Sequence, residues 1–236
     1  MSSVSGGAPS RRREFLGGVR DEAPILLGVA PFGVIFGALA MAAHLSTAAA
    51  QAMSSVIFAG SAQFIAAQLL AGSAASGLVI VAVVFVVNLR HALYSASVAP
   101  HVKHLGPVWK VVLAYLLTDE AYAVVIAHYN EAGDASQKHW YYLGAGLTLW
   151  SCWQVCTAVG ILLGSRIPED WPLGFVLPLT FIALVVPNLR ERSMVLAALV
   201  AGLAGALAIG FPLKTGLLVA ALAGILTGLL AERVRQ

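Results

Sequence analysis

Long apolar runs separated by short polar stretches make up most of the chain after residue 22. A membrane-crossing helix needs about 20 apolar residues, so runs of this length predict membrane helices. Eight such segments follow one another: residues 23–45, 48–70, 77–99, 107–129, 141–165, 173–186, 193–210 and 213–230. We therefore predict an all-α integral membrane protein.

Two of the segments are poorly suited to an uninterrupted crossing. Residues 48–70 contain Ser54, Ser55, Gly60 and Ser61, and glycine and serine are weak helix-interior residues. Non-helical backbone at membrane depth is tolerated where it lines a protein cavity, so this segment is a candidate re-entrant substrate site. Helix packing through small residues is the alternative interpretation.

The second unsuitable segment is residues 173–186, which is short for a crossing. Pro172 and Pro187 bound it, and Pro178 lies inside it. Proline removes a backbone donor and breaks or kinks a helix. This segment is therefore the second candidate for a re-entrant, non-spanning hairpin.

Basic residues indicate the topology. Arg11-Arg12-Arg13 follows a Ser/Gly/Pro-rich start, and we predict a disordered cytoplasmic N-terminus over residues 1–20. The arginines also match a twin-arginine export signal, but the apolar segments behind them favour a topology signal. Eight crossings would place the basic loop at residues 100–110 outside. Six crossings with two re-entrant segments place that loop inside and residues 130–139 outside.

This six-crossing arrangement divides one transmembrane domain, residues 21–232, into halves at 23–130 and 141–231. Each half has an odd number of crossings, so the halves would be inverted relative to each other. Inverted halves with corresponding broken segments are typical of secondary transporters with a site near the bilayer midplane. Eight spanning helices are the alternative.

Composition supports the membrane assignment and narrows the chemistry. Of the residues, 59% are hydrophobic and 11% are charged, against about 25% charged in soluble domains. Cys152 and Cys156 lie one helical turn apart and are interpreted as buried apolar residues. No zinc-ligand spacing, nucleophile elbow or phosphate loop is present in the sequence. We therefore expect no enzyme, no metal and no cofactor.

Four ionisable residues lie near the predicted bilayer centre. Arg90 and His91 are in segment 77–99, and Asp119 and Glu120 are in the next segment. A charge at this depth costs about 2.5–3.5 kcal/mol on insertion scales, so clusters of opposite sign are expected to pair. Such a pair is either a structural salt bridge or a coupling and substrate site.

One continuous helix over residues 107–129 would place Tyr115, Asp119 and Tyr122 on a shared face. Glu120 would then be rotated by about 100° from that face.

Four ordered motifs resemble the AzlC-type (azaleucine resistance) family, the large subunits of bacterial branched-chain amino acid exporters. The motifs are Gly28-Val29-Ala30-Pro31-Phe32-Gly33, Ala59-Gly60-Ser61-Ala62-Gln63-Phe64, Asn88-Leu89-Arg90-His91-Ala92-Leu93-Tyr94-Ser95 and Leu117-Thr118-Asp119-Glu120-Ala121-Tyr122. The resemblance covers most of residues 20–230 and is densest over 25–125.

The resemblance implies export of valine, leucine and isoleucine, and in some members methionine. It also implies a small AzlD-type membrane subunit as partner, use of the proton gradient, and residence in the bacterial inner membrane. A passive channel, or a scaffold that stabilises a membrane partner, is the alternative function. An intramembrane enzyme is less favoured because no nucleophile–base pair stands out.

The expected mechanism is alternating access around a midplane site. Backbone N–H groups near Gly60 and Ser61 would hold the substrate carboxylate, and Asp119 or Glu120 would balance its ammonium group or carry the coupled proton. The predicted substrate-binding residues are Gly60, Ser61, Gln63, Asn88 and Pro31. The predicted coupling and ion-pair residues are Arg90, His91, Asp119 and Glu120.

Overall fold

Every regular element in the described part of the computed structural model is an α-helix. The structure describes residues 10–71, 76–131, 137–166, 189, 191–211 and 216–233. Three helical segments there are long and apolar enough to cross a membrane: α1 (Arg11–Ala42), Gly77–Val102 and α8 (Lys138–Gly164). The predicted all-α membrane fold is confirmed, while the number of spans stays a prediction.

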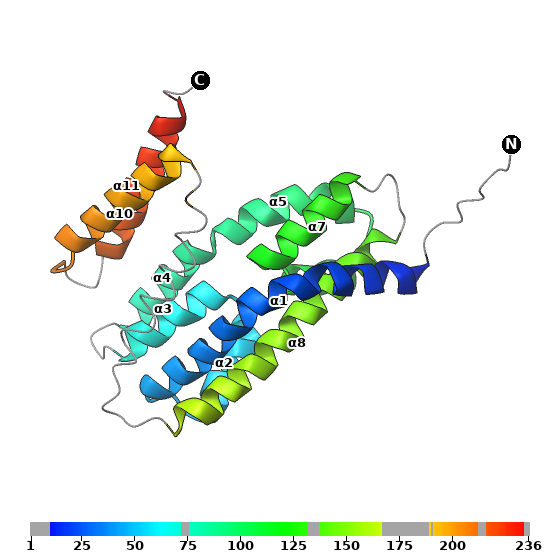
Figure 1. The fold of residues 1–236 in the computed structure, drawn as a ribbon, viewed down its shortest axis with the longest axis horizontal. Coiled ribbons are helices and arrows are strands. Elements are labelled where there is room, and N and C mark those ends of the chain that lie inside the picture. Colours follow the sequence, from blue (N-terminus) through cyan, green and yellow to red (C-terminus); the bar gives the residue numbers. More distant parts are fainter. Residues whose placement is uncertain are drawn as a thin grey trace, which may run out of the picture. The chain divides into compact units, whose positions relative to one another are not determined.

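The chain divides into two compact units, Met1–Trp171 and Pro172–Gln236, which are described separately (Figure 1). The predicted re-entrant segment at residues 173–186 lies outside the described residues. The second unit contains an antiparallel hairpin of α10 (Arg192–Leu207) and α11 (Gly216–Arg233). These two helices confirm the predicted seventh and eighth apolar segments as helical.

In unit 1, α1 and α8 run side by side and parallel (Figure 1). Glycines bring the two backbones together: Gly18 lies against Tyr141 near one end, and Gly160 lies against Val34 near the other. A Cβ atom at either glycine would overlap a backbone carbonyl oxygen of the partner helix. Small residues allow such close approach of membrane helices, and this pair forms the core of the unit.

Helix α1 begins earlier than predicted. Ser10 caps it by accepting a hydrogen bond from the Arg13 N–H (3.3 Å), so residues 11–20 are helical and the predicted disorder is wrong there. Helix α1 also continues as a helix through Pro31, a residue that often breaks a helix. Close packing along α8 stabilises this stretch from the side, which allows a membrane helix to tolerate proline.

The segment predicted at residues 48–70 is broken, as expected. Helix α2 (Thr47–Ile57) ends at Phe58, which is left-handed with φ 39° and ψ 48°, and α3 begins after Ala59 (Gly60–Ala71). A non-glycine residue in this conformation is strained and needs support from its surroundings. Phe58 receives that support because its side chain is buried, 4% exposed, with its ring 6.0 Å from that of Tyr115.

The third segment is nearly continuous. Helix α4 (Gly77–Asn88) is followed by α5 (Arg90–Val102), with only Leu89 between them. Leu89 keeps right-handed helical angles, φ −56° and ψ −27°, so the two helices form one rod long enough to cross a membrane. The irregular turn falls immediately before Arg90.

The fourth segment differs from its prediction. Helix α6 (Pro107–Tyr115) stops, and α7 (Asp119–Glu131) begins after Thr118. The Thr118 hydroxyl accepts a hydrogen bond from the Ala121 N–H (3.3 Å), which is N-cap geometry. Two carboxylates in the first turn of α7 complement the positive end of the helix.

This break overturns the predicted shared face of Tyr115, Asp119 and Tyr122. Tyr115 belongs to α6, whereas Asp119 starts a new helix, so helical spacing does not relate them. The Tyr115 hydroxyl instead donates to the Ser55 carbonyl oxygen, and the Trp150 indole N–H donates to the Tyr115 oxygen (2.7 Å).

Both ends of the α6–α7 segment lie beside the start of α8. Trp109 in α6 packs edge-on against Trp140, with ring centroids 5.0 Å apart. At the end of α7, the Tyr129 hydroxyl donates to the Lys138 carbonyl oxygen (3.2 Å). Residues 107–131 therefore enter and leave unit 1 at one end, where a crossing was predicted.

The α2–α3 segment enters from the opposite end. Residues 43–46 connect α2 to the end of α1, and residues 72–76 connect α3 to the start of α4. The α4–α5 rod then runs to His101, whose ring lies 4.9 Å from that of Tyr129 near the start of α8. Unit 1 thus contains two broken segments that enter from opposite ends, between three long helices.

The predicted side of loop 130–139 is consequently wrong. The Arg11 guanidinium lies 5.9 Å from the Trp140 ring centroid, so the start of α1 and the start of α8 share one end of the unit. The prediction failed because residues 107–131 return to the end they left, which reverses the direction expected for α8.

The predicted inverted relation between residues 23–130 and 141–231 also fails at their first helices. Inversion requires α1 and α8 to be antiparallel, and they are parallel. The repeat halves themselves stay a prediction, since part of the second half lies outside the described residues.

Cysteine labelling tests this arrangement in intact cells. In a chain with Cys152 and Cys156 replaced by serine, we expect His104→Cys and Gln137→Cys to be protected from an impermeant maleimide. Thr47→Cys, at the opposite end of unit 1, should react. Labelling of the 104 and 137 positions from different sides of the membrane would contradict the arrangement.

Candidate functional site

Three helix starts converge at the middle of unit 1. Arg90 begins α5, and its guanidinium donates through Nη1 to the Asp119 carboxylate at the start of α7. Through Nη2 the same group donates to the Ser61 hydroxyl at the start of α3. The predicted ion pair between the two central segments is confirmed in the structure, and it also includes the broken second segment.

The chemistry of arginine explains this arrangement. A guanidinium presents several N–H donors in a fixed fork, so one side chain can bridge two acceptors on different helices. The side chains of Arg90 and Asp119 are 33% and 37% exposed within the chain. The described residues of unit 1 therefore enclose the bridge only in part.

Aromatic side chains form the wall behind Gly60. Phe36 on α1 stacks on Trp153 of α8, with ring centroids 6.3 Å apart, and packs edge-on against Phe64 of α3 (5.9 Å). A Cβ atom at Gly60 would lie 3.0 Å from the Trp153 ring, so a larger residue at this position would require the indole to shift. Trp153 is 6% exposed and fills the core here.

A hydrogen-bonded cluster attaches α2 to α8 just before the break. The Gln154 Oε1 atom accepts from Gln51 (2.7 Å) and from the Ser55 hydroxyl (2.9 Å), and the Gln154 amide donates to the Ser54 carbonyl oxygen (3.2 Å). The buried Ser54 and Thr157 hydroxyls are 3.0 Å apart. Interhelical hydrogen bonds of this kind hold membrane helices in register.

Sequence reasoning missed the α8 members of this cluster. Gln154 and Thr157 are polar residues three apart in a mostly apolar segment, and that spacing was the available signal.

Two predicted substrate-binding residues have buried polar atoms with no protein partner in the described part of the chain. Gln63 is fully buried, and neither amide atom is hydrogen-bonded. The side-chain oxygen of Asn88 is likewise buried and unbonded. An unsatisfied buried polar group costs about 1–3 kcal/mol, so these atoms favour a bound polar ligand or water.

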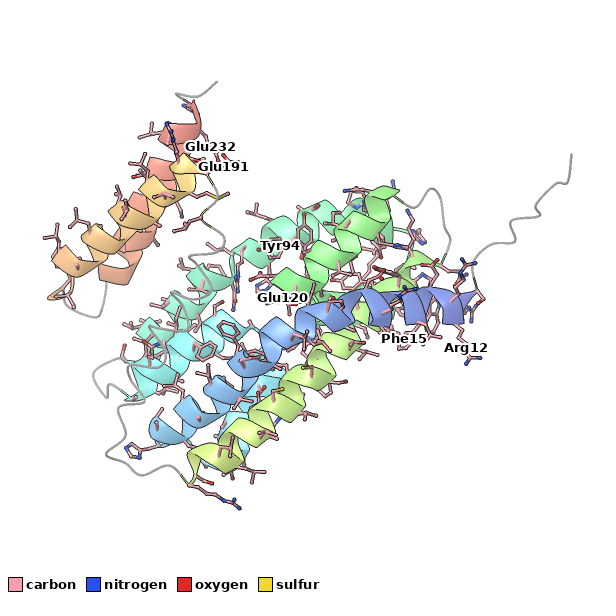
Figure 2. The ribbon with its side chains drawn as sticks, in the orientation of Figure 1. Arg12, Phe15, Tyr94, Glu120, Glu191 and Glu232 are labelled. Atoms are coloured by element: carbon pink, nitrogen blue, oxygen red, sulfur yellow. The ribbon has the colours of Figure 1, made fainter. Side chains whose placement is uncertain are left out.

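The remaining predicted residues are less central. His91 approaches the Asn88 carbonyl oxygen through Nδ1 (3.2 Å) and packs edge-on against Tyr94 (5.9 Å), so its described contacts are local. Pro31 is exposed on α1. Glu120 is half-buried in the first turn of α7, where Figure 2 labels it, and is not part of the Arg90 bridge among the described contacts.

Together, three long apolar helices and two oppositely entering broken segments around a charged centre define a multi-pass membrane protein consistent with a transporter-type function. The chain belongs to the AzlC protein family, whose model matches residues 24–167.

Its relatives are membrane proteins. The inner membrane protein YgaZ of Escherichia coli K12 is 31% identical over 230 residues, covering 94% of this chain and 90% of that protein. A membrane protein of Archaeoglobus fulgidus is 33% identical over 232 residues, covering 95% and 96%. One from Helicobacter pylori 26695 is 31% identical over 186 residues, covering 76% and 79%. No solved structure matches the chain.

Proposed function

We propose that this chain is the large subunit of a proton-coupled secondary transporter that exports valine, leucine, isoleucine and methionine. The observation that carries the proposal is the Arg90 bridge, because it joins the starts of two half-helices that enter unit 1 from opposite ends. A zwitterion complements this pair of charges: its carboxylate suits Arg90, and its ammonium group suits Asp119.

Binding would proceed by insertion into the bridge. The substrate carboxylate would accept hydrogen bonds from the Arg90 guanidinium and from the backbone N–H groups of the first turn of α3, near Gly60 and Ser61. The substrate ammonium group would form an ion pair with the Asp119 carboxylate, whose Oδ1 atom has no hydrogen-bond partner in the described part of the chain. Gln63 and Asn88 would orient the substrate with their unbonded amide atoms.

Alternating access follows from opposite entry of the broken segments. Movement of α2–α3 would open the centre toward one end of unit 1, and movement of α6–α7 would open it toward the other. A substrate that replaces protein contacts at the Arg90 bridge would loosen the link between these segments. Because one methylene is worth only about 1–3 kcal/mol, selectivity among aliphatic side chains should be modest.

We further propose residence in the bacterial inner membrane with the N-terminus in the cytoplasm. Arg11, Arg12 and Arg13 share one end of unit 1 with Lys103 and with the start of α8, which matches the positive-inside rule. A small AzlD-type membrane subunit is the proposed partner, and no chemical conversion of the amino acid is expected.

Efflux of labelled leucine and valine from loaded cells tests the function. We expect Asp119→Asn and Glu120→Gln to lower efflux at least about tenfold at equal membrane levels, because each removes a carboxylate from the centre of the unit. Full efflux in both variants would remove the proposed binding chemistry.

A scaffold role is the competing interpretation, because the Arg90 bridge also holds helices together. A scaffold should tolerate joint neutralisation of the pair, Arg90→Gln with Asp119→Asn, whereas a transporter should lose efflux in that double variant.

A further inference from the structure

Glu22 in α1 has the most unusual environment of the acidic side chains described. Its side chain is fully buried, and neither carboxyl oxygen has a hydrogen-bond partner in the described part of the chain. Nearby acids on the same helix are satisfied: Asp21 accepts from the Tyr141 hydroxyl (2.8 Å), and Glu14 contacts His128 (3.2 Å). Sequence reasoning missed Glu22 because the predicted apolar segment begins at the next residue.

Glu22 lies on the face of α1 that borders both α8 and the half-helix α7. Glu14, Gly18 and Glu22 are all buried and recur every four residues, so they lie on one face of α1. On α7, Glu120 and His128 are related by the same helical spacing. His128 meets Glu14 at one end of this interface, and the charge of Glu120 acts on Glu22 at the other.

The groups around Glu22 are acidic or neutral. The charge of Glu120 on α7 acts on Glu22, and Glu22 acts together with Asp21 and Glu14 of α1 on Tyr141 of α8. No described lysine or arginine donates to it, and Arg90 is bonded to two other partners.

This environment disfavours a charged carboxylate. An unpaired charge in a low-dielectric interior costs several kcal/mol, and a neighbouring carboxylate increases that cost. In the conformation described, no donor in the described part of the chain compensates a charge on this side chain. Ionisation requires water or a cation, and displacement of α7 from α1 would admit either.

We propose that Glu22 binds and releases the proton coupled to transport, exchanging it through the α1–α7 interface toward Glu14 and His128. The carboxylate takes a proton from a hydronium ion at that end, forming an O–H bond and leaving water. It gives the proton to a water molecule at the opposite end of unit 1 once the centre opens there. Asp119 then stays with Arg90 and the substrate. This inference rests on the proposed function and names the group that couples it to protons.

Infrared spectroscopy tests proton binding without reference to a substrate. The full chain, with any subunit that copurifies, is reconstituted in lipid vesicles, and difference spectra are recorded between acidic and alkaline pH. We expect the C=O stretch of a neutral carboxylic acid to disappear as the pH rises. This band should be missing in Glu22→Gln, shifted in Glu22→Asp and unchanged in Asp21→Asn, the matched control for an exposed neighbouring carboxylate.

Flux in the same vesicles tests coupling. Uptake of labelled leucine driven by a pH gradient should fall at least about tenfold in Glu22→Gln, whereas counterflow of leucine, which needs no net proton movement, should persist. Gradient-driven uptake should survive in Glu22→Asp.

Three results would overturn the proposal: no Glu22 band at any pH, a band that never changes with pH, or normal gradient-driven uptake in Glu22→Gln. A different result would contradict the proposed function and leave the Glu22 proposal open to its own test. If the wild-type chain shows no counterflow with any aliphatic amino acid, the substrate assignment is wrong, and the infrared spectra still decide whether Glu22 exchanges a proton.

Discussion

Replacement of Arg90 by alanine should reduce leucine and valine efflux at least about tenfold, which corresponds to 1.4 kcal/mol of lost interaction. The guanidinium donates to both Asp119 and Ser61, so its loss separates the starts of three helices and leaves a carboxylate without its cation. Hydrogen bonds to charged groups contribute about 1.5–3 kcal/mol each, and the partial exposure of this pair lowers that value.

Arg90→Lys is the matched control for this prediction. Lysine keeps the positive charge, but as a compact ammonium it does not reproduce the planar fork of arginine. We expect it to keep normal membrane levels and lose most of the efflux, which would separate the bridging geometry from charge alone. Normal efflux in Arg90→Ala would show that the bridge takes no part in transport.

Gly160→Ala should prevent stable folding of unit 1. The added Cβ would overlap the Val34 carbonyl oxygen on α1, and a backbone atom cannot move aside as a flexible side chain can. Overpacking a tight interface costs about 1–3 kcal/mol or more, and here the two helices would have to separate along their length. We expect a large fall in thermal stability in detergent and little protein in the membrane.

Gly28→Ala is the matched control, because it makes the same glycine-to-alanine change in a helix. Gly28 is also a glycine inside α1, but a Cβ at this position meets nothing within 4 Å. Alanine is the better helix former by about 1 kcal/mol, so this variant should fold as well as the wild type or better. Equal stability of the two variants, measured by thermal unfolding and size-exclusion chromatography, would contradict the packing described for α1 and α8.

Local signals in the sequence predicted several features of the site. The Ser/Gly-rich stretch around Gly60 predicted the break in the second segment, which the structure shows at Phe58 and Ala59. The cost of an unpaired charge within the membrane predicted that Arg90 would meet an acid on the next segment, and it meets Asp119.

Other signals were present but not decisive. Thr118 followed by two acids is a helix N-terminus signature, yet the apolar run on both sides favoured one continuous helix over residues 107–129. In the structure, Thr118 caps a new helix, α7, and the run over residues 107–129 is not continuous. Glu22 was overlooked as a candidate site residue because the first helix was expected to begin with the apolar run at residue 23, whereas α1 begins at Arg11.

The apolar segments were enough to predict an all-helical membrane protein, because a segment in lipid must satisfy its backbone hydrogen bonds internally and a helix does so locally. Only the packing of the helices shows which segments turn back within unit 1, the parallel pairing of α1 with α8, and the burial of Glu22. These features depend on which glycine faces which carbonyl across helices more than 100 residues apart, and no local pattern in the chain encodes that contact.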